Sequence, residues 1–242
     1  MLAVALVAWV VTLDRMRGMD AGPGTDLGAL GWFLGVWTTM MAAMMLPSAL
    51  PAIVVFTRAA RGGTAALAFP AGYLLVWAAY GLAAYGVYRL LAAAAPSFLA
   101  WDDAGPYVAG AAIVAAGLYE LTPLKAVCLR HCRSPLHFLL ARWRPGTRGA
   151  LLMGGEHGLW CAGCCWALML VLFAVGVMSV AWMAVIALVV FAEKVLPGGR
   201  RLTLGIAAAL VVLGLWIALA PGSVPGLTEP GGTAPMEMGM GG

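Results

Sequence analysis

The sequence MGGEHGLWCAGCCWALM, from Met153 to Met169, places one histidine and three cysteines in an otherwise apolar segment. Side chains four residues apart lie on the same face of an α-helix. One such line contains Met153, His157, Cys161, Cys165 and Met169, with Cys164 beside it. Thiols and thioethers suit Cu(I), whereas thiols and imidazoles also suit Zn(II). The segment therefore predicts a helix that carries a soft-metal site on one face.

The composition indicates a membrane protein. The chain has 242 residues, of which 63% are hydrophobic and 10% are charged, and its mean hydropathy is +0.95. A soluble domain has about 25% charged residues. The five cysteines are too few and odd in number for a disulfide framework. No nucleotide-binding fingerprint is present, and no basic face lies outside the apolar pattern, which excludes a nucleic-acid partner.

We expect an all-α, polytopic transmembrane bundle of about seven spans that forms one domain over residues 1–220. The predicted spans are 1–13, 28–56, 65–95, 105–124, 151–175, 179–196 and 202–220. A polar, basic loop over 125–150 separates the fourth span from the fifth. The Met-rich, Gly/Pro-containing tail 221–242 is expected to be disordered. The first block is shorter than the roughly 20 residues of a span, and no basic residue precedes it, which favours a shortened helix over a signal peptide.

The second span contains four closely spaced methionines, Met40, Met41, Met44 and Met45. They form two pairs four residues apart, so their thioethers share one side of a helix. Pro47 and Pro51 follow, and we expect them to kink this helix. The methionines are either metal ligands opposite the fifth span or residues that fill packing gaps.

Two further groups are secondary metal candidates. Cys128, His131 and Cys132 lie within about one helical turn of each other in the basic loop. A zinc site usually needs a fourth ligand, and none is adjacent in sequence, so reduced cysteines without a metal remain the alternative. The tail adds three thioethers, from Met236, Met238 and Met240.

Two acidic residues are candidates for support of the metal ligands. Glu156 precedes His157 and would orient its imidazole, as carboxylates near metal sites often do. Glu120 ends the fourth span. A carboxylate inside the bilayer is costly and would be functional, whereas one at the interface would pair with Lys125 or Arg130.

The positive residues predict the orientation of the chain. The loops 58–64, 125–150 and 194–201 hold eleven of the fourteen Lys and Arg residues. Because positive residues mark the cytoplasmic side, we expect a protein of the cytoplasmic (inner) membrane with its N-terminus inside and its C-terminal tail outside. Methionines outside, a central Cys/His/Met site and cysteines inside would form a route for a soft metal.

Three stretches resemble a bacterial family of predicted metal-binding integral membrane proteins of unknown function. They are WTTMMAAMMLPSALP at 37–51, YELTPLKAVCLRHCRSP at 119–135 and GEHGLWCAGCCWALM at 155–169. The resemblance extends over about residues 32–196 and includes Phe173, Gly176, Met178, Met183, Glu193 and Lys194. It implies a membrane location and metal binding, but no particular activity.

The leading hypothesis is a membrane protein that binds, and transports or delivers, a soft metal ion. Copper as Cu(I) is favoured over zinc because thioethers are so numerous, and a periplasmic or membrane metalloprotein would be its partner. A thiol-redox protein that uses Cys161, Cys164 and Cys165 is the second hypothesis. A structural or assembly subunit of a membrane complex is the third. We expect a binding protein rather than an enzyme.

Overall fold

The computed structural model describes residues 2–16, 27–60, 62–94, 104–176, 179–196 and 199–224. In these ranges the chain forms α-helices and one short 3-10 helix, and no β-strand, which confirms the all-α prediction. The helices are α1 (Leu2–Met16), α2 (Leu30–Ala59), α3 (Ala65–Ala94), α4 (Gly105–Glu120), α5 (Pro123–Arg133), α6 (Pro135–Arg142), α7 (Gly146–Val175), α8 (Val180–Val195), α9 (Gly199–Leu219) and the 3-10 helix η2 (Pro221–Ser223).

Four helices are long and apolar enough to cross a membrane, so the predicted number of seven spans is not confirmed. The four are α2, α3, α7 and α9. The pair α4 and α5 is bent by 65° and counts as a fifth candidate if it forms one broken span. The helices α1 and α8 have 15 and 16 residues. A helix that crosses the bilayer needs about 20 residues, so these two helices are too short. Each of the seven predicted ranges contains a helix, but length limits which of them qualify.

The basic loop predicted over 125–150 is mostly helical, so that prediction was wrong. Thr122 is the N-cap of α5, and its hydroxyl accepts a hydrogen bond from the Lys125 backbone N–H at 3.3 Å. Pro123 occupies the first turn, where its missing N–H costs nothing. Pro135 begins α6 in the same way, and α7 begins at Gly146 rather than at 151. These helices give the connection a fixed shape.

The second predicted span is one continuous helix that contains both prolines. The helix α2 continues from Leu30 to Ala59 with Pro47 and Pro51 inside it. The Ser48 hydroxyl donates to the Met45 carbonyl oxygen at 2.9 Å. At the other end of the chain, η2 begins the predicted tail. The rest of that tail, with Met236, Met238 and Met240, lies outside the described residues.

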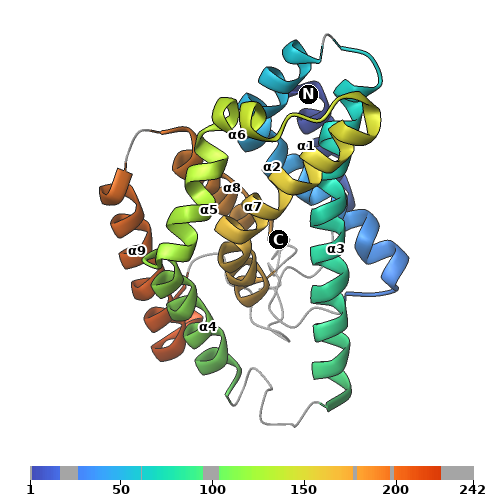
Figure 1. The fold of residues 1–242 in the computed structure, drawn as a ribbon. Coiled ribbons are helices and arrows are strands. Elements are labelled where there is room, and N and C mark those ends of the chain that lie inside the picture. Colours follow the sequence, from blue (N-terminus) through green and yellow to red (C-terminus); the bar gives the residue numbers. More distant parts are fainter. Residues whose placement is uncertain are drawn as a thin grey trace, which may run out of the picture.

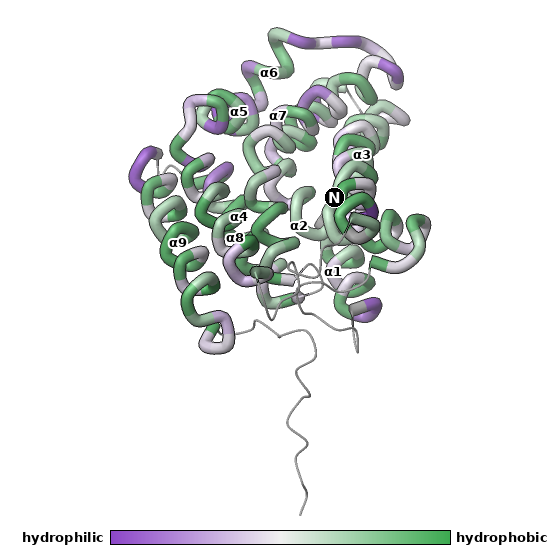
Figure 2. The backbone as a smooth tube through the Cα atoms, turned by 90° about the horizontal axis from the view of Figure 1, so that it is seen from below, coloured by the Kyte–Doolittle hydropathy of each residue, from purple (hydrophilic) through white to green (hydrophobic). Residues whose placement is uncertain are grey.

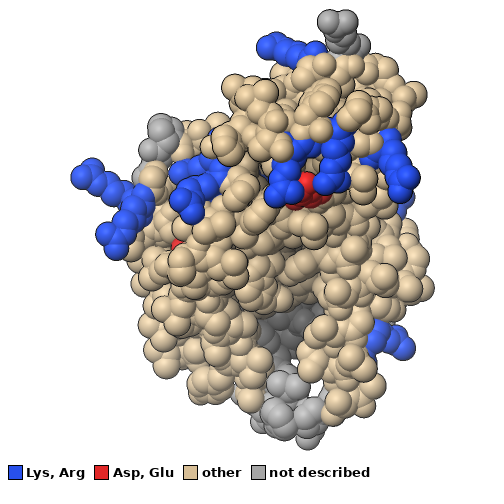
Figure 3. Space-filling model, in the orientation of Figure 1, with Lys and Arg blue, Asp and Glu red and all other residues tan. Residues whose placement is uncertain are grey.

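The helix α7 occupies the middle of the molecule (Figure 1). It packs against α3, α4, α5 and α8, while α2 packs against α1, α3 and α8, and α4 lies beside α9. Figure 2 shows the long helices as largely hydrophobic, with hydrophilic residues concentrated near helix ends. In Figure 3 the Lys and Arg side chains of the visible face lie mostly in its upper half. The assignment of that side to the cytoplasm remains a prediction.

Glycines allow α3 and α7 to approach closely. Gly154 and Gly158 lie four residues apart on α7, and Gly72 of α3 meets the α7 backbone at Leu151 and Gly155. A Cβ at Gly154 would overlap the Phe69 carbonyl, and a Cβ at Gly158 would lie 3.1 Å from the Tyr73 carbonyl oxygen. Small residues at this spacing are common where membrane helices pack with their backbones in contact. This contact fixes the position of α7 relative to Tyr73.

Replacing Gly154 by alanine is expected to destabilise the protein by about 1–3 kcal/mol, because the added methyl group forces two helix backbones apart. Gly155→Ala is the matched control, since its Cβ would lie 3.8 Å from the nearest atom, the Gly72 carbonyl oxygen, at ordinary contact distance. Thermal unfolding of both variants in the same detergent measures the difference. Equal melting temperatures for the two variants would refute the close approach of α3 and α7.

Candidate metal site

The line of side chains singled out in the sequence lies on the buried face of α7. Its members Met153, His157, Cys161, Cys164, Cys165 and Met169 are each at most 2% exposed. By contrast, Leu159 on the same helix is 64% exposed. The helix therefore turns its sulfur and imidazole groups towards its neighbours rather than towards the surroundings.

Three thiols form a compact cluster. The sulfurs of Cys161, Cys164 and Cys165 all lie within 4.8 Å of one another, and those of Cys164 and Cys165 are 3.4 Å apart. Spacings of three and four residues bring these side chains together on a helix. The cluster could hold a metal ion, and its donors are the soft type that Cu(I) and Zn(II) share.

A fourth cysteine joins this cluster from a different helix. The Cys132 sulfur lies 3.8 Å from the Cys164 sulfur. Cys132 is half-buried, whereas Cys161, Cys164 and Cys165 are buried. Since α5 packs against α7, a residue 32 positions away in sequence completes a four-sulfur group. The donor set includes an outer member that is more accessible than the rest.

The other two members of the predicted second cluster point elsewhere. Cys128 packs against Gly163, where an added Cβ would lie 2.7 Å from the Cys128 sulfur. The His131 ring stacks on Trp160 with centroids 4.0 Å apart, and its Nδ1 lies 2.9 Å from the Val127 carbonyl oxygen. The side chains of Cys128, His131 and Cys132 therefore do not come together, and the predicted second metal site is not formed.

Two polar side chains that the sequence did not single out as ligands contact Cys161. The Lys194 ammonium donates to the Cys161 sulfur at 2.8 Å and to the Ser48 hydroxyl at 3.2 Å. The Tyr73 hydroxyl forms a hydrogen bond of 2.9 Å with the same sulfur. Within the described residues no carboxylate is in ion-pair contact with Lys194. A buried ammonium needs a counter-charge, and Cys161 would supply one when its thiol is ionised.

The sequence contained one signal for this contact. Glu193 and Lys194 are adjacent charged residues at the end of the apolar helix α8, and both are buried. Charged residues in such a position usually pair with each other or mark a functional site. Their sequence position alone does not show which partner each one faces.

His157 lies one turn before Cys161, among aromatic rings. Its ring centroid is 5.5 Å from that of Phe138 and 6.0 Å from those of Phe69 and Tyr73. His157 Nδ1 is buried and has no hydrogen-bond partner within the described residues. A buried polar atom without a partner is unusual, and it leaves this nitrogen free for a metal or a water molecule.

The predicted supporting roles of the two acidic residues do not match their contacts. The Glu156 carboxylate pairs with the Arg142 guanidinium at 3.0 Å and lies 3.9 Å from that of Arg144. It is drawn towards these cations rather than towards His157. Glu120 forms an ion pair with Lys125, which also binds Glu193 at 2.7 Å. The predicted pairing of Glu120 with Lys125 is therefore present, and both side chains are buried.

The methionines of α2 are buried, and their surroundings differ from those of Met153 on α7. Met40, Met41, Met44 and Met45 are each at most 1% exposed. Met44 lies one turn before Ser48, which contacts Lys194, so this face of α2 is turned towards α8. On α7, the Met153 sulfur instead accepts a hydrogen bond from the Arg144 backbone N–H at 3.2 Å.

A helical bundle with spans of membrane length and a buried thiol cluster defines a class of candidate soft-metal-binding membrane protein. The chain matches the family model PpoB2, described as a copper chaperone, over residues 34–217, and it belongs to this family. The match contains all four cysteines of the site and Lys194. The predicted resemblance to a family of metal-binding proteins is confirmed in part by this match, whereas the description of that family as being of unknown function is not confirmed. No curated protein and no solved structure matches the chain.

Proposed function

We propose that this protein is a membrane-embedded copper chaperone that binds Cu(I) through Cys161, Cys164 and Cys165. The observation that carries the proposal is the convergence of three buried thiols within 4.8 Å in a chain of a copper chaperone family. Cu(I) prefers soft thiolate and thioether ligands. His157 and Met44 are further candidate ligands from the same buried region.

The donor type of the cluster and the family match favour copper as the cargo. Three thiolates carry a net charge of −2 with Cu⁺ and −1 with Zn²⁺, and the Lys194 ammonium, 2.8 Å from the Cys161 sulfur, offsets one negative charge in either complex. Copper as Cu(I) is the proposed cargo because thiolates are soft ligands and the chain belongs to a copper chaperone family, with zinc as the alternative that the experiment below tests.

We further propose that Cys132 transfers the metal to its acceptor. A chaperone must release its cargo, and metal passes readily between thiolates that can bind it at the same time. Cys132 lies beside Cys164 and is more exposed than the other three thiols. The acceptor would be a periplasmic or membrane metalloprotein.

The proposed location is the cytoplasmic membrane, with the loops around 58–64, 125–150 and 194–201 on the cytoplasmic side. The support for this orientation is the positive-inside rule applied to eleven of fourteen Lys and Arg residues. The N-terminus would then be inside and the C-terminal tail outside. Labelling of single cysteines introduced at Arg58 and in the tail, from either side of the membrane, tests it.

Metal binding by the purified protein tests the proposed function. In detergent and without oxygen, the protein is expected to bind Cu(I) in competition with a chromophoric chelator. The double variant Cys161→Ser/Cys165→Ser should lose this binding, because it keeps only one of the three thiols of the cluster. Cys128→Ser is the matched control. Cys128 is buried as well, but it lies on α5 and packs against Gly163 outside the cluster. Full copper stoichiometry in the double variant, or tighter binding of Zn(II) than of Cu(I), would contradict the proposal.

A further inference from the structure

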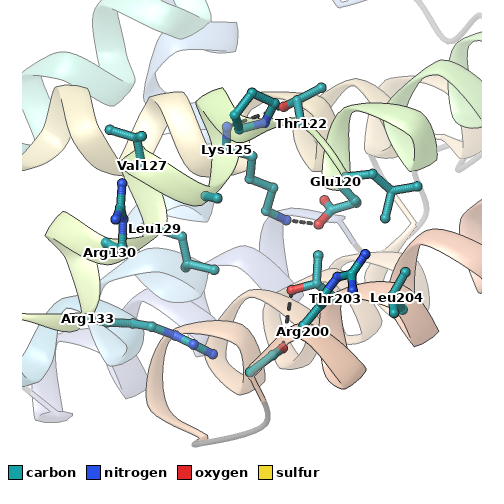
Figure 4. Close-up of a pocket in the computed structure, with 14 residues that line it drawn as sticks. Glu120, Thr122, Lys125, Val127, Leu129, Arg130, Arg133, Arg200, Thr203 and Leu204 are labelled. Carbon is teal, nitrogen blue, oxygen red and sulfur yellow. Dashed lines mark hydrogen bonds and ion pairs between the residues drawn. The ribbon is translucent and has the colours of Figure 1, made fainter.

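A second feature of the molecule lies away from the thiols. A pocket of about 590 Å³ opens between α5 and the first turns of α9, beside the end of α4 (Figure 4). Its lining contains three guanidinium groups, from Arg130, Arg133 and Arg200, and the Thr203 hydroxyl. Apolar side chains such as Leu204 complete the walls. None of these residues takes part in the proposed copper site.

The charges inside the pocket leave an excess of positive groups. The Lys125 ammonium is held between the Glu120 and Glu193 carboxylates, and Lys125 and both carboxylates are buried. This trio carries one net negative charge, whereas the three guanidinium groups carry three positive charges. Arg130 and Arg200 are exposed and have no hydrogen bond or ion pair within the described residues. The pocket is therefore suited to an anion.

One guanidinium group is already fixed in position. Arg133 Nε donates to the Glu193 carbonyl oxygen at 2.6 Å, and its Nη2 donates to the Leu196 carbonyl oxygen at 3.1 Å. A guanidinium group has five N–H donors, so others remain available. Planar guanidinium groups bind phosphate oxygens in pairs. The ordered Arg133 gives the pocket a preformed part, while Arg130 and Arg200 would close on a ligand.

The place of the pocket on the molecule indicates the source of the anion. The pocket lies at the N-terminal end of α9, a candidate span of which only 22% is buried against the rest of the protein. Leu121 and Leu204 at the pocket are 52% and 43% exposed, so apolar surface adjoins the guanidinium groups. At the end of a span, phosphate groups of the bilayer lie at this depth and acyl chains lie beside the apolar surface.

We propose that this pocket binds the phosphate group of an anionic phospholipid, with the acyl chains along the exposed surface of α9. A soluble phosphate compound shares the same chemistry, but it would make no use of the exposed leucines. The headgroup would link α5 to α9, and α5 carries Cys132.

Native mass spectrometry of the full-length protein, purified and depleted of lipid in detergent, tests this proposal. Phosphatidylglycerol added to this protein is expected to bind, and phosphatidylcholine to bind at least about tenfold more weakly, because its headgroup carries a compensating positive charge. The variant Arg130→Gln/Arg200→Gln should lower phosphatidylglycerol affinity by about 10- to 30-fold. Arg58→Gln/Arg201→Gln is the matched control, because both residues are exposed, neither lines the pocket, and the charge change is the same.

Three results would overturn the proposal. Equal loss of phosphatidylglycerol in both double variants would mean that only the overall positive charge attracts lipid. Equal binding of the two lipids would exclude recognition of an anionic headgroup. Displacement of phosphatidylglycerol by millimolar inorganic phosphate would assign the pocket to a soluble phosphate compound. Circular dichroism of each variant establishes that it is folded, so that loss of lipid reflects the pocket itself.

Discussion

Replacement of Lys125 by methionine is expected to lower the free energy of unfolding by about 3–5 kcal/mol, because it leaves buried charges without a partner. Lys125 is 1% exposed, and Glu120 and Glu193 are each 2% exposed. The ammonium forms an ion pair with Glu120 and lies 2.8 and 2.7 Å from the two Glu193 oxygens. Without it, two carboxylates face each other at the junction of α4, α5 and α8. Denaturation by a graded amount of SDS, followed by tryptophan fluorescence, measures the loss.

A variant without any charge at this junction is the control for that result. In Glu120→Gln/Lys125→Met/Glu193→Gln the unpaired charges are absent, and buried ion pairs replaced by neutral groups often cost little. This triple variant should recover most of the lost stability. If Lys125→Met is as stable as the unchanged protein, or if the triple variant is less stable than the single one, the ion trio does not hold these helices together.

Replacement of Lys194 by leucine is expected to weaken Cu(I) binding by about 10- to 100-fold, since a tenfold change corresponds to about 1.4 kcal/mol and buried charge pairs are worth more than this. The Lys194 ammonium lies 2.8 Å from the Cys161 sulfur, and in the proposed complex it offsets the negative charge of the thiolates bound to Cu(I). Leucine carries no charge and, unlike methionine, no sulfur that would bind copper. Competition with a chromophoric Cu(I) chelator measures the change in dissociation constant.

Two further variants separate charge from packing at this position. Lys194→Arg keeps the positive charge and should retain more of the copper affinity than Lys194→Leu. Ser48→Ala removes the second hydrogen-bond acceptor of Lys194 without a change in charge, and should alter affinity by less than about fivefold. Unchanged or tighter copper binding in Lys194→Leu would show that the ammonium has no part in holding the metal.

The sequence was sufficient to predict the long apolar helices and the face of α7 that is buried. Long apolar blocks form helices because a helix satisfies its own backbone hydrogen bonds, so the ranges around α2, α3, α7 and α9 could be predicted. The spacing of His157, Cys161 and Cys165 places them on one face of a helix whatever surrounds it. Their burial followed because an imidazole and thiols have no favourable contact with lipid.

The predicted loop over 125–150 was less successful, for a local reason. Hydropathy alone does not measure where a helix ends. The chain turns at Leu121 and Thr122, where Thr122 caps a new helix and Pro123 begins it. The basic residues that follow lie on α5 and α6 instead of on an open loop. The composition of this segment therefore indicated its positive charge but not its helical conformation.

The sequence by itself determined the helices, the buried line of thiols on α7 and the soft-metal character of their donor groups, because these follow from residue type and helical period. Only the tertiary structure decided the partners: Cys132 beside Cys164, Lys194 on Cys161, and Glu156 drawn away to Arg142. These contacts depend on how α5 and α8 pack against α7. That packing is set by contacts between residues far apart in the chain, such as those of Gly72 with α7 and of Lys125 with Glu193, which no local pattern contains.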